Sequence, residues 1–443
     1  MTSSSPPFQL YAELLVNIRQ VSVSASFQGP VDTKKTTAQV LPDGVTLRVS
    51  VDNGKQHAVT LTLPGQVAVG ASGGQLPLQG PALASGYVAW RLPLAGQAGQ
   101  DDSDLAPWSA PDLQPGSSVS CRGCNTSLVP SGRIHTWKDL PSDNWAEMME
   151  FWHCHKPDVK KADTNGKSVG DEKGLADRGY GANSIISAEA GVGFVDLTTL
   201  LFSESDCQGL LFSDSTADKA SPSLDTILES VQKAVTGAAV AAAAAPNTLT
   251  APRGLNIFCA SCRAQIGYFT LRRQQSVHLF KWQVDLRLGQ TSAPEKVQAK
   301  PTIADCVAAT LVATIQRTGS SKSLVLPIYE LEELSSEESA EKVLQVWVLN
   351  SNIVYSASGR LTDSSSQRPA RAIKLLYKYI PRKEADAILD NLNSDVQEIN
   401  LPRETIGAVT ELLGTSTQLL PARDRNFKGW KIGLLERWDP TRL

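Results

Sequence analysis

The chain has 443 residues, of which 41% are hydrophobic and 20% are charged, and its formal net charge is −3. This length predicts two or three domains with buried cores, and the near-neutral charge without a long basic run excludes a nucleic-acid-binding surface. The first twenty residues lack a signal-peptide pattern, and the apolar run at 236–246 is mostly alanine and too short to span a bilayer. We therefore expect a soluble intracellular protein that contacts neither nucleic acid nor membrane.

The N-terminal part has the two-residue periodicity of β-strands. Alternating apolar residues over 45–51 and 59–63 flank the turn-forming sequence DNGKQ, which predicts a hairpin. Residues 86–94 predict a further strand, and a loop rich in Gly, Asp, Ser and Pro follows over 95–118. This part of the chain is therefore expected to be built mainly from β-sheet.

Two Cys-x-x-Cys pairs stand beside strand-like sequence. They are CRGC, with Cys121 and Cys124, and CASC, with Cys259 and Cys262. The two-residue gap lets a tight turn direct both sulfurs at one ion, and two such turns complete a tetrahedral thiolate zinc site. A redox pair or a coincidence are the alternatives, but neither pair opens a helix after a strand. We predict a structural zinc site with no open coordination position.

Residues 143–157, DNWAEMMEFWHCHKP, begin with a predicted short helix capped by Asn144 and Glu147. One face of this helix carries four large apolar side chains, which are Trp145, Met148, Met149 and Trp152. Such a face either packs on its own domain or serves as the anchor of a helix that docks into a partner's groove.

The helix leads into the sequence His153-Cys154-His155. Cys154 is a candidate zinc ligand, a candidate nucleophile or a plain buried thiol, and the flanking histidines would lower its pKa when protonated or bind metal themselves. A thiolate offered to another protein's open metal site would displace the activated water. The residues alone leave these alternatives open.

The rest of the chain is mixed. We expect a polar surface loop over 156–183, a buried strand or strand pair over 191–202 and a Ser/Ala-rich insertion over 213–253. The segment 276–289 predicts one strand with its apolar residues on one face, and strands and helices follow to the C-terminus. The predicted fold class is α+β, with a β-rich domain at 1–275 that holds the zinc knuckle pair and a mixed α/β domain at 276–443.

The segment LPSDNWAEMMEFWHCHKP, together with CRGC, GVGFVDLTTLLF and CASCRAQIG, resembles one family closely. This is the family of HECT-like ubiquitin-conjugating-enzyme-binding proteins, whose fungal version is related to the yeast factor important for polyadenylation. The resemblance implies two functions: acceptance and transfer of ubiquitin, or binding of the metallo-β-lactamase-type endonuclease that cleaves pre-mRNA 3′ ends. In the second function, Cys154 matches the residue that is thought to reach the partner's two catalytic zincs.

The residues themselves weigh against thioester chemistry. A HECT ligase domain has a cysteine close to its C-terminus, whereas no cysteine follows Cys306 in this chain. Cys306 lies in a predicted buried helix stripe, and Cys207 has no neighbouring base to activate it. The cysteine pairs also lack the spacing of a RING domain. The sequence therefore predicts no catalytic residue.

We expect a binding partner, inhibitor and stabiliser of the 3′-end endonuclease that inserts Cys154, helped by His155, into its di-zinc site. The residues expected to bind this partner are Trp145, Met148, Met149, Trp152 and His153. The alternative is a ubiquitin-protein ligase or adaptor that binds a ubiquitin-conjugating enzyme and promotes substrate ubiquitination. The expected cofactor is Zn²⁺, held structurally by the chain and contacted in the partner, and the expected location is the nucleus and cytoplasm.

Overall fold

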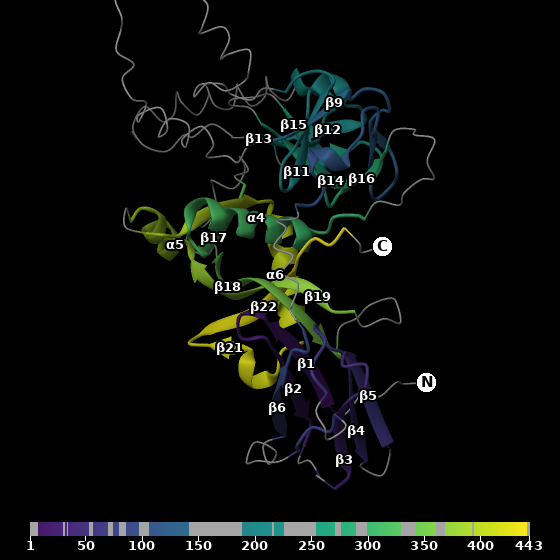
Figure 1. The fold of residues 1–443 in the computed structure, drawn as a ribbon. Helices are drawn as coiled ribbons and strands as arrows, with labels where there is room; N and C mark the ends of the chain where they lie inside the picture. Colours follow the sequence, from purple (N-terminus) through teal and green to yellow (C-terminus); the bar gives the residue numbers. More distant parts are fainter. Residues whose placement is uncertain are drawn as a thin grey trace, which may run out of the picture. The chain divides into compact units, whose positions relative to one another are not determined.

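The computed structural model places fifteen segments of the chain, and the fold is described from these. They are residues 8–29, 32, 34–52, 56–69, 74–78, 86–96, 106–140, 188–214, 217–225, 254–270, 276–288, 299–328, 342–359, 368–391 and 394–440. The structure is β-rich with few helices, and it divides into two compact units (Figure 1). Unit 1 comprises residues 1–107, 301–328 and 336–443, and unit 2 comprises 108–300 with 329–335.

Unit 1 is organised around one large sheet. Its main path is β21 (Asn426–Phe427), β22 (Trp430–Glu436), β19 (Ala370–Pro381), β18 (Lys342–Ala357), β1 (Phe8–Leu15), β2 (Gln20–Phe27) and β6 (Tyr87–Pro93). β17 (Lys322–Pro327) pairs with the first half of β18, and β20 (Gln397–Leu401) pairs with β17 in parallel. Strands from both ends of the chain therefore share one sheet.

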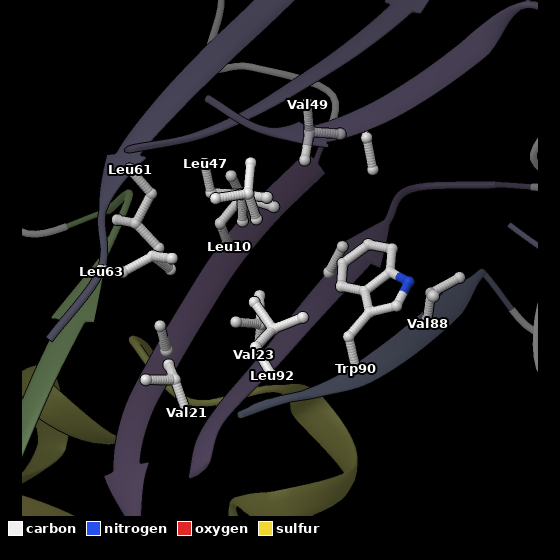
Figure 2. Packing of buried hydrophobic residues seen from close by; sticks show 14 of the residues in the cluster. Leu10, Val21, Val23, Leu47, Val49, Leu61, Leu63, Val88, Trp90 and Leu92 are labelled. Carbon is white, nitrogen blue, oxygen red and sulfur yellow. The ribbon is translucent and has the colours of Figure 1, made fainter. Parts of the chain in front are cut away.

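The N-terminal strands form a two-layer core. A small sheet of β3 (Thr36–Val40), β4 (Thr46–Asp52) and β5 (Gln56–Thr62) packs its apolar face on β1, β2 and β6. Leu10, Leu47 and Leu61 are fully buried in this core, and Trp90 lies beside them on β6 (Figure 2). The hairpin and the strand expected at 86–94 are confirmed, and Leu47, Val49 and Leu61 of the hairpin and Val88, Trp90 and Leu92 of β6 are buried in this shared interior.

Helices cover the other half of the large sheet. α4 (Ile303–Thr318) and α6 (Arg403–Thr417) pack on the face formed by β17, β18, β19, β20 and β22, and α5 (Arg382–Leu389) packs near the start of β18. Thr302 and Asp305 form the capping box that begins α4. No helix among these residues is long and apolar enough to cross a membrane.

Unit 2 contains two sheets. The seven-stranded sheet has the order β12 (Leu210–Ser213), β13 (Gly254–Cys259), β14 (Gln265–Thr270), β15 (Val277–Phe280), β11 (Thr199–Phe202), β10 (Val192–Val195) and β9 (Thr136–Asp139). The three-stranded sheet has the order β16 (Val284–Arg287), β7 (Ser118–Cys121) and β8 (Ser127–Val129). β10 and β11 confirm the strand pair expected within 191–202.

The division into units differs from the expected layout of 1–275 and 276–443. Tyr11 on β1 pairs with Ala357 on β18, so the N-terminal strands belong with the C-terminal part. Conversely, β15 and β16 pair with strands of the middle of the chain. Long-range strand pairing of this kind leaves no signal in local periodicity, which is why a boundary placed from composition misses it.

The single strand expected at 276–289 is wrong. A turn at 281–283 separates β15 from β16, and these two strands join different sheets. Lys281 in this turn is fully buried, and its ammonium donates a hydrogen bond to the Trp108 carbonyl at 3.1 Å. Phe280 and Trp282 therefore stack on one another across the turn, with ring centroids 4.8 Å apart, instead of lining one strand face.

Candidate metal centre

The two Cys-x-x-Cys turns have the same backbone design. In the first, the Cys121 N–H donates to the Thr126 carbonyl at 2.8 Å and the Asn125 N–H donates back to the Cys121 carbonyl at 2.8 Å. In the second, the Cys259 N–H donates to the Ala264 carbonyl at 2.9 Å and the Arg263 N–H donates back to the Cys259 carbonyl at 3.0 Å. Each turn thus begins at the last residue of a strand and places its second cysteine three positions later.

Both turns close through a residue in the left-handed region of backbone space. These residues are Asn125, with φ of 60°, and Arg263, with φ of 61°. Asn adopts this conformation readily, whereas Arg does so at a cost. The Arg263 side chain donates to the Ala217 carbonyl at 3.2 Å, which helps to hold the strained turn. The repeated geometry identifies the two segments as a pair of knuckles.

The first knuckle is fixed to the turn between β15 and β16. The Arg122 N–H donates to the Gln283 carbonyl at 2.9 Å, and its guanidinium donates to the Val284 carbonyl at 2.8 Å. The same guanidinium forms an ion pair with Asp285 at 3.1 Å, and Lys300 reaches the other oxygen of Asp285 at 2.6 Å. Sequence reasoning missed Arg122 and Asp285, because their partners are set only by the fold.

The second knuckle is fixed in an equivalent way. The Ala260 N–H donates to the Gly209 carbonyl at 2.9 Å, and the neighbouring Gln208 N–H donates to the Leu128 carbonyl at 2.8 Å. Leu128 lies on β8, which follows the first knuckle. Main-chain hydrogen bonds therefore connect the surroundings of the two knuckles, and these bonds bring the cysteine pairs together.

The four sulfurs predicted to share an ion do lie together. Cys121 Sγ is 3.6 Å from Cys262 Sγ, Cys124 Sγ is 3.6 Å from Cys259 Sγ, and all four sulfurs lie within 4.8 Å of one another. Four thiolates that bind zinc at roughly 2.3 Å in a tetrahedron place their sulfurs about 3.8 Å apart. The cluster therefore has the dimensions of a site that could hold a metal ion.

The protonation chemistry of the thiols also fits a cation. Burial raises the pKa of Cys121 to about 12, so this thiol keeps its proton at neutral pH unless a positive ion replaces it. Hydrogen bonds from the side chain and backbone of Thr126 lower the pKa of Cys124 to about 6. Metal binding must displace the remaining protons, so affinity is expected to rise with pH.

The remaining described cysteines are set apart from this cluster. Cys306 is fully buried on α4, as its position in the apolar stripe predicts. Burial raises the pKa of Cys207 far above its ordinary value, and the negative charges of Asp206 and Glu204 raise this pKa further. The Cys207 thiol donates a hydrogen bond to the Ser203 carbonyl at 3.4 Å. Cys207 therefore lacks the lowered pKa that a nucleophile requires, and the Cys306 thiol is enclosed by the core.

The residues predicted to reach a partner lie outside the described part of the chain. They are Trp145, Met148, Met149, Trp152, His153, Cys154 and His155. The two flanks of their segment are described: β9 leads into it, β10 follows it, and these strands are parallel neighbours. The Leu140 N–H donates to the Val195 carbonyl at 2.8 Å, and the Gly191 N–H donates to the buried Asp206 carboxylate at 2.7 Å.

Fold and site together define a β-rich protein with a four-thiol centre built from two knuckles. The chain belongs to the family described as HECT-like ubiquitin-conjugating enzyme (E2)-binding, whose model matches residues 13–432. This match confirms the family resemblance noted in the sequence. It extends over nearly the whole chain and includes residues of both units.

Two curated yeast proteins match a short part of the chain. An uncharacterized protein of Saccharomyces cerevisiae is 38% identical over 56 residues, which is 12% of this chain and 16% of that protein. An uncharacterized protein of Schizosaccharomyces pombe is 41% identical over 58 residues, which is 12% of this chain and 17% of that protein. The matched stretch thus spans less than a fifth of either relative. No solved structure matches the chain.

Proposed function

We propose that this protein binds a ubiquitin-conjugating enzyme and acts as a ubiquitin-pathway adaptor. The observation that carries the proposal is the match of the E2-binding family model to residues 13–432. A match of that extent makes the folded chain as a whole, and not a short motif, the unit associated with E2 binding.

The chemistry of the described cysteines favours binding over a thioester relay. A HECT-type mechanism needs an accessible thiolate to receive ubiquitin from the conjugating enzyme. Cys306 is enclosed by the helix core, Cys207 holds its proton tightly, and the other four described cysteines are gathered in the knuckles. We therefore expect the protein to hold a charged conjugating enzyme without accepting its ubiquitin on any of these six thiols.

Zinc is the ion that we assign to the knuckles. Four thiolates in a tetrahedral arrangement are a donor set that zinc prefers, and they leave no position for a substrate or an activated water. Cys121, Cys124, Cys259 and Cys262 would hold the ion and so cross-link the three-stranded and seven-stranded sheets of unit 2. Its role in this proposal is structural.

The endonuclease remains a prediction from the segment around Cys154, and the comparisons do not support it as the partner. The E2-binding function and the endonuclease-binding function predict different captured proteins, so they are separable by experiment. We also propose that the protein acts in the nucleus and cytoplasm, where thiols remain reduced and available for zinc.

Direct binding to purified conjugating enzymes tests the proposal. The zinc-loaded full chain would be titrated against a panel of these enzymes by biolayer interferometry, with metal-stripped protein measured in parallel. We expect saturable binding to at least one member of the panel. Binding to none of them would contradict the proposed function.

A second assay separates an adaptor from a ligase that forms a thioester. The protein would be incubated with a conjugating enzyme charged with fluorescent ubiquitin and run on a non-reducing gel. No thiol-sensitive adduct is expected on the wild-type chain. An adduct that disappears in Cys207→Ser, Cys306→Ser or Cys154→Ser would instead identify the receiving cysteine and establish a ligase mechanism.

A further inference from the structure

The four knuckle cysteines differ in their access to solvent. Cys121 and Cys259, each the first cysteine of its pair, are buried, Cys124 is half-buried and Cys262 is exposed. A fully enclosed structural site would shield all four sulfurs equally. Cys262 is the most exposed of the four knuckle residues, which makes it the first candidate for attack by a small oxidant.

The sulfur paired with Cys262 belongs to the opposite knuckle. Cys121 Sγ lies 3.6 Å away, although the two residues are 141 positions apart in the chain. The second cross-knuckle pair, Cys124 and Cys259, has the same 3.6 Å separation. A disulfide has an S–S bond of roughly 2.05 Å, so the facing turns need to close by about 1.5 Å as the bond forms.

We propose that the knuckle pair is a reversible redox switch, in which peroxide oxidation replaces the bound zinc ion with a disulfide between Cys262 and Cys121. The proposal rests on the zinc assignment above and not on E2 binding. It goes beyond a structural role, because the same four residues then hold the sheets together in two chemically different states.

The reaction balances with one hydrogen peroxide for each disulfide. The Cys262 thiolate attacks one peroxide oxygen, which forms a sulfenic acid and releases hydroxide. The Cys121 thiolate then attacks the Cys262 sulfur, forms the S–S bond and releases a second hydroxide. The two sulfurs lose two electrons in total, peroxide gains them, and solvent protons convert both hydroxides to water.

Zinc release follows because the ion loses two of its four ligands. The remaining pair, Cys124 and Cys259, can consume a second peroxide in the same way. A dithiol reductant would reverse both disulfides and restore the four-thiolate site. The described cysteines outside the cluster do not compete, since Cys306 is buried and burial keeps Cys207 protonated.

Peroxide titration of the zinc-loaded full chain tests the switch. Zinc release would be followed with a chromophoric chelator, and the disulfides would be mapped by mass spectrometry. Trypsin cleaves after Arg122 and so separates Cys121 from Cys124, while fragmentation of the peptide that ends at Arg263 distinguishes Cys259 from Cys262. We expect about one zinc released per protein, a Cys121–Cys262 link and full recovery with reductant and zinc.

Cys207→Ser is the matched control, and it should release zinc as the wild type does. Cys262→Ser should lose the cross-knuckle link at this position and release zinc at least several-fold more slowly. If that variant does not fold, the wild-type disulfide map still decides the question. Zinc retention under peroxide, a link within one knuckle or irreversible oxidation would overturn the switch. Protein that contains no zinc when purified would instead remove the metal centre on which the switch rests.

Discussion

Zinc removal should destabilise unit 2 severely. The knuckles join chain segments 135 positions apart, and a covalent cross-link over a loop of that length contributes about 5 kcal/mol of loop-closure entropy. The ion should contribute at least this much, since structural zinc binding in small domains is worth roughly 10–16 kcal/mol. A whole domain is commonly stable by only about 5–15 kcal/mol. Metal-free unit 2 is therefore expected to be at or below the limit of stability.

The assay is thermal unfolding of the full chain with and without a strong zinc chelator. A loss of about 5 kcal/mol corresponds to a fall in Tm of roughly 10–20 °C for a unit of this size. Trp108, Trp137 and Trp282 lie in unit 2, whereas Trp90, Trp347, Trp430 and Trp438 lie in unit 1, so tryptophan fluorescence reports the unfolding of both units. Cys121→Ser should resemble chelation, whereas Cys207→Ser should not. An unchanged Tm after complete removal of bound metal would refute the reasoning.

Three further predictions concern the described core. Gly267→Ala should lower the free energy of unfolding, measured with denaturant, by about 1–3 kcal/mol, because the added Cβ would collide with the His278 carbonyl. Gly407→Ala on α6 meets open space and should raise the free energy of unfolding by up to about 1 kcal/mol. Equal effects of the two substitutions would contradict this reasoning. Lys374→Ala should cost about 1–3 kcal/mol, because it leaves the buried carboxylate of Glu13 without its 2.8 Å ammonium partner, and an unchanged unfolding midpoint would argue against it. Burial lowers the pKa of His278 to about 4 in the folded protein, whereas an unfolded histidine has a pKa of about 6.5. Below pH 6.5 the unfolded chain therefore binds a proton at His278 that the folded protein does not. About 3 kcal/mol of the free energy of unfolding is lost as the pH falls from 6.5 to 4. His278→Phe should flatten that part of the stability curve, and a curve identical to the wild type would count against the assignment.

The parts of the fold that sequence predicted are those governed by local rules. The hairpin over 45–63 follows from alternating side chains around a turn, and α6 begins directly after Pro402, a residue type that favours helix starts. The end of α6 was less predictable, since the helix passes through Gly414 and continues to Thr417. A glycine only permits a helix to end, and packing of Leu413 and its neighbours on the sheet carries the helix further.

The metal centre shows how far residue spacing reaches. The spacing identified the four ligands, because a Cys-x-x-Cys turn requires only local geometry. It did not reveal Arg122 or Asp285, whose contacts depend on the turn at 281–283, and that turn was expected to be part of a strand. The pairing of β1 with β18 was equally hidden, since the partners lie more than 300 residues apart.

Affinity purification of the tagged protein from its own cells, with the eluate identified by mass spectrometry, tests the central claim most directly. Wild type, Trp152→Ala and Cys154→Ala would be compared under non-reducing and reducing conditions. The account predicts that a ubiquitin-conjugating enzyme is captured by all three proteins, and purified components should then reproduce the complex. Capture of the 3′-end endonuclease without any conjugating enzyme, with loss of the endonuclease in Trp152→Ala, would contradict the E2-binding account and establish the segment around Cys154 as the working surface.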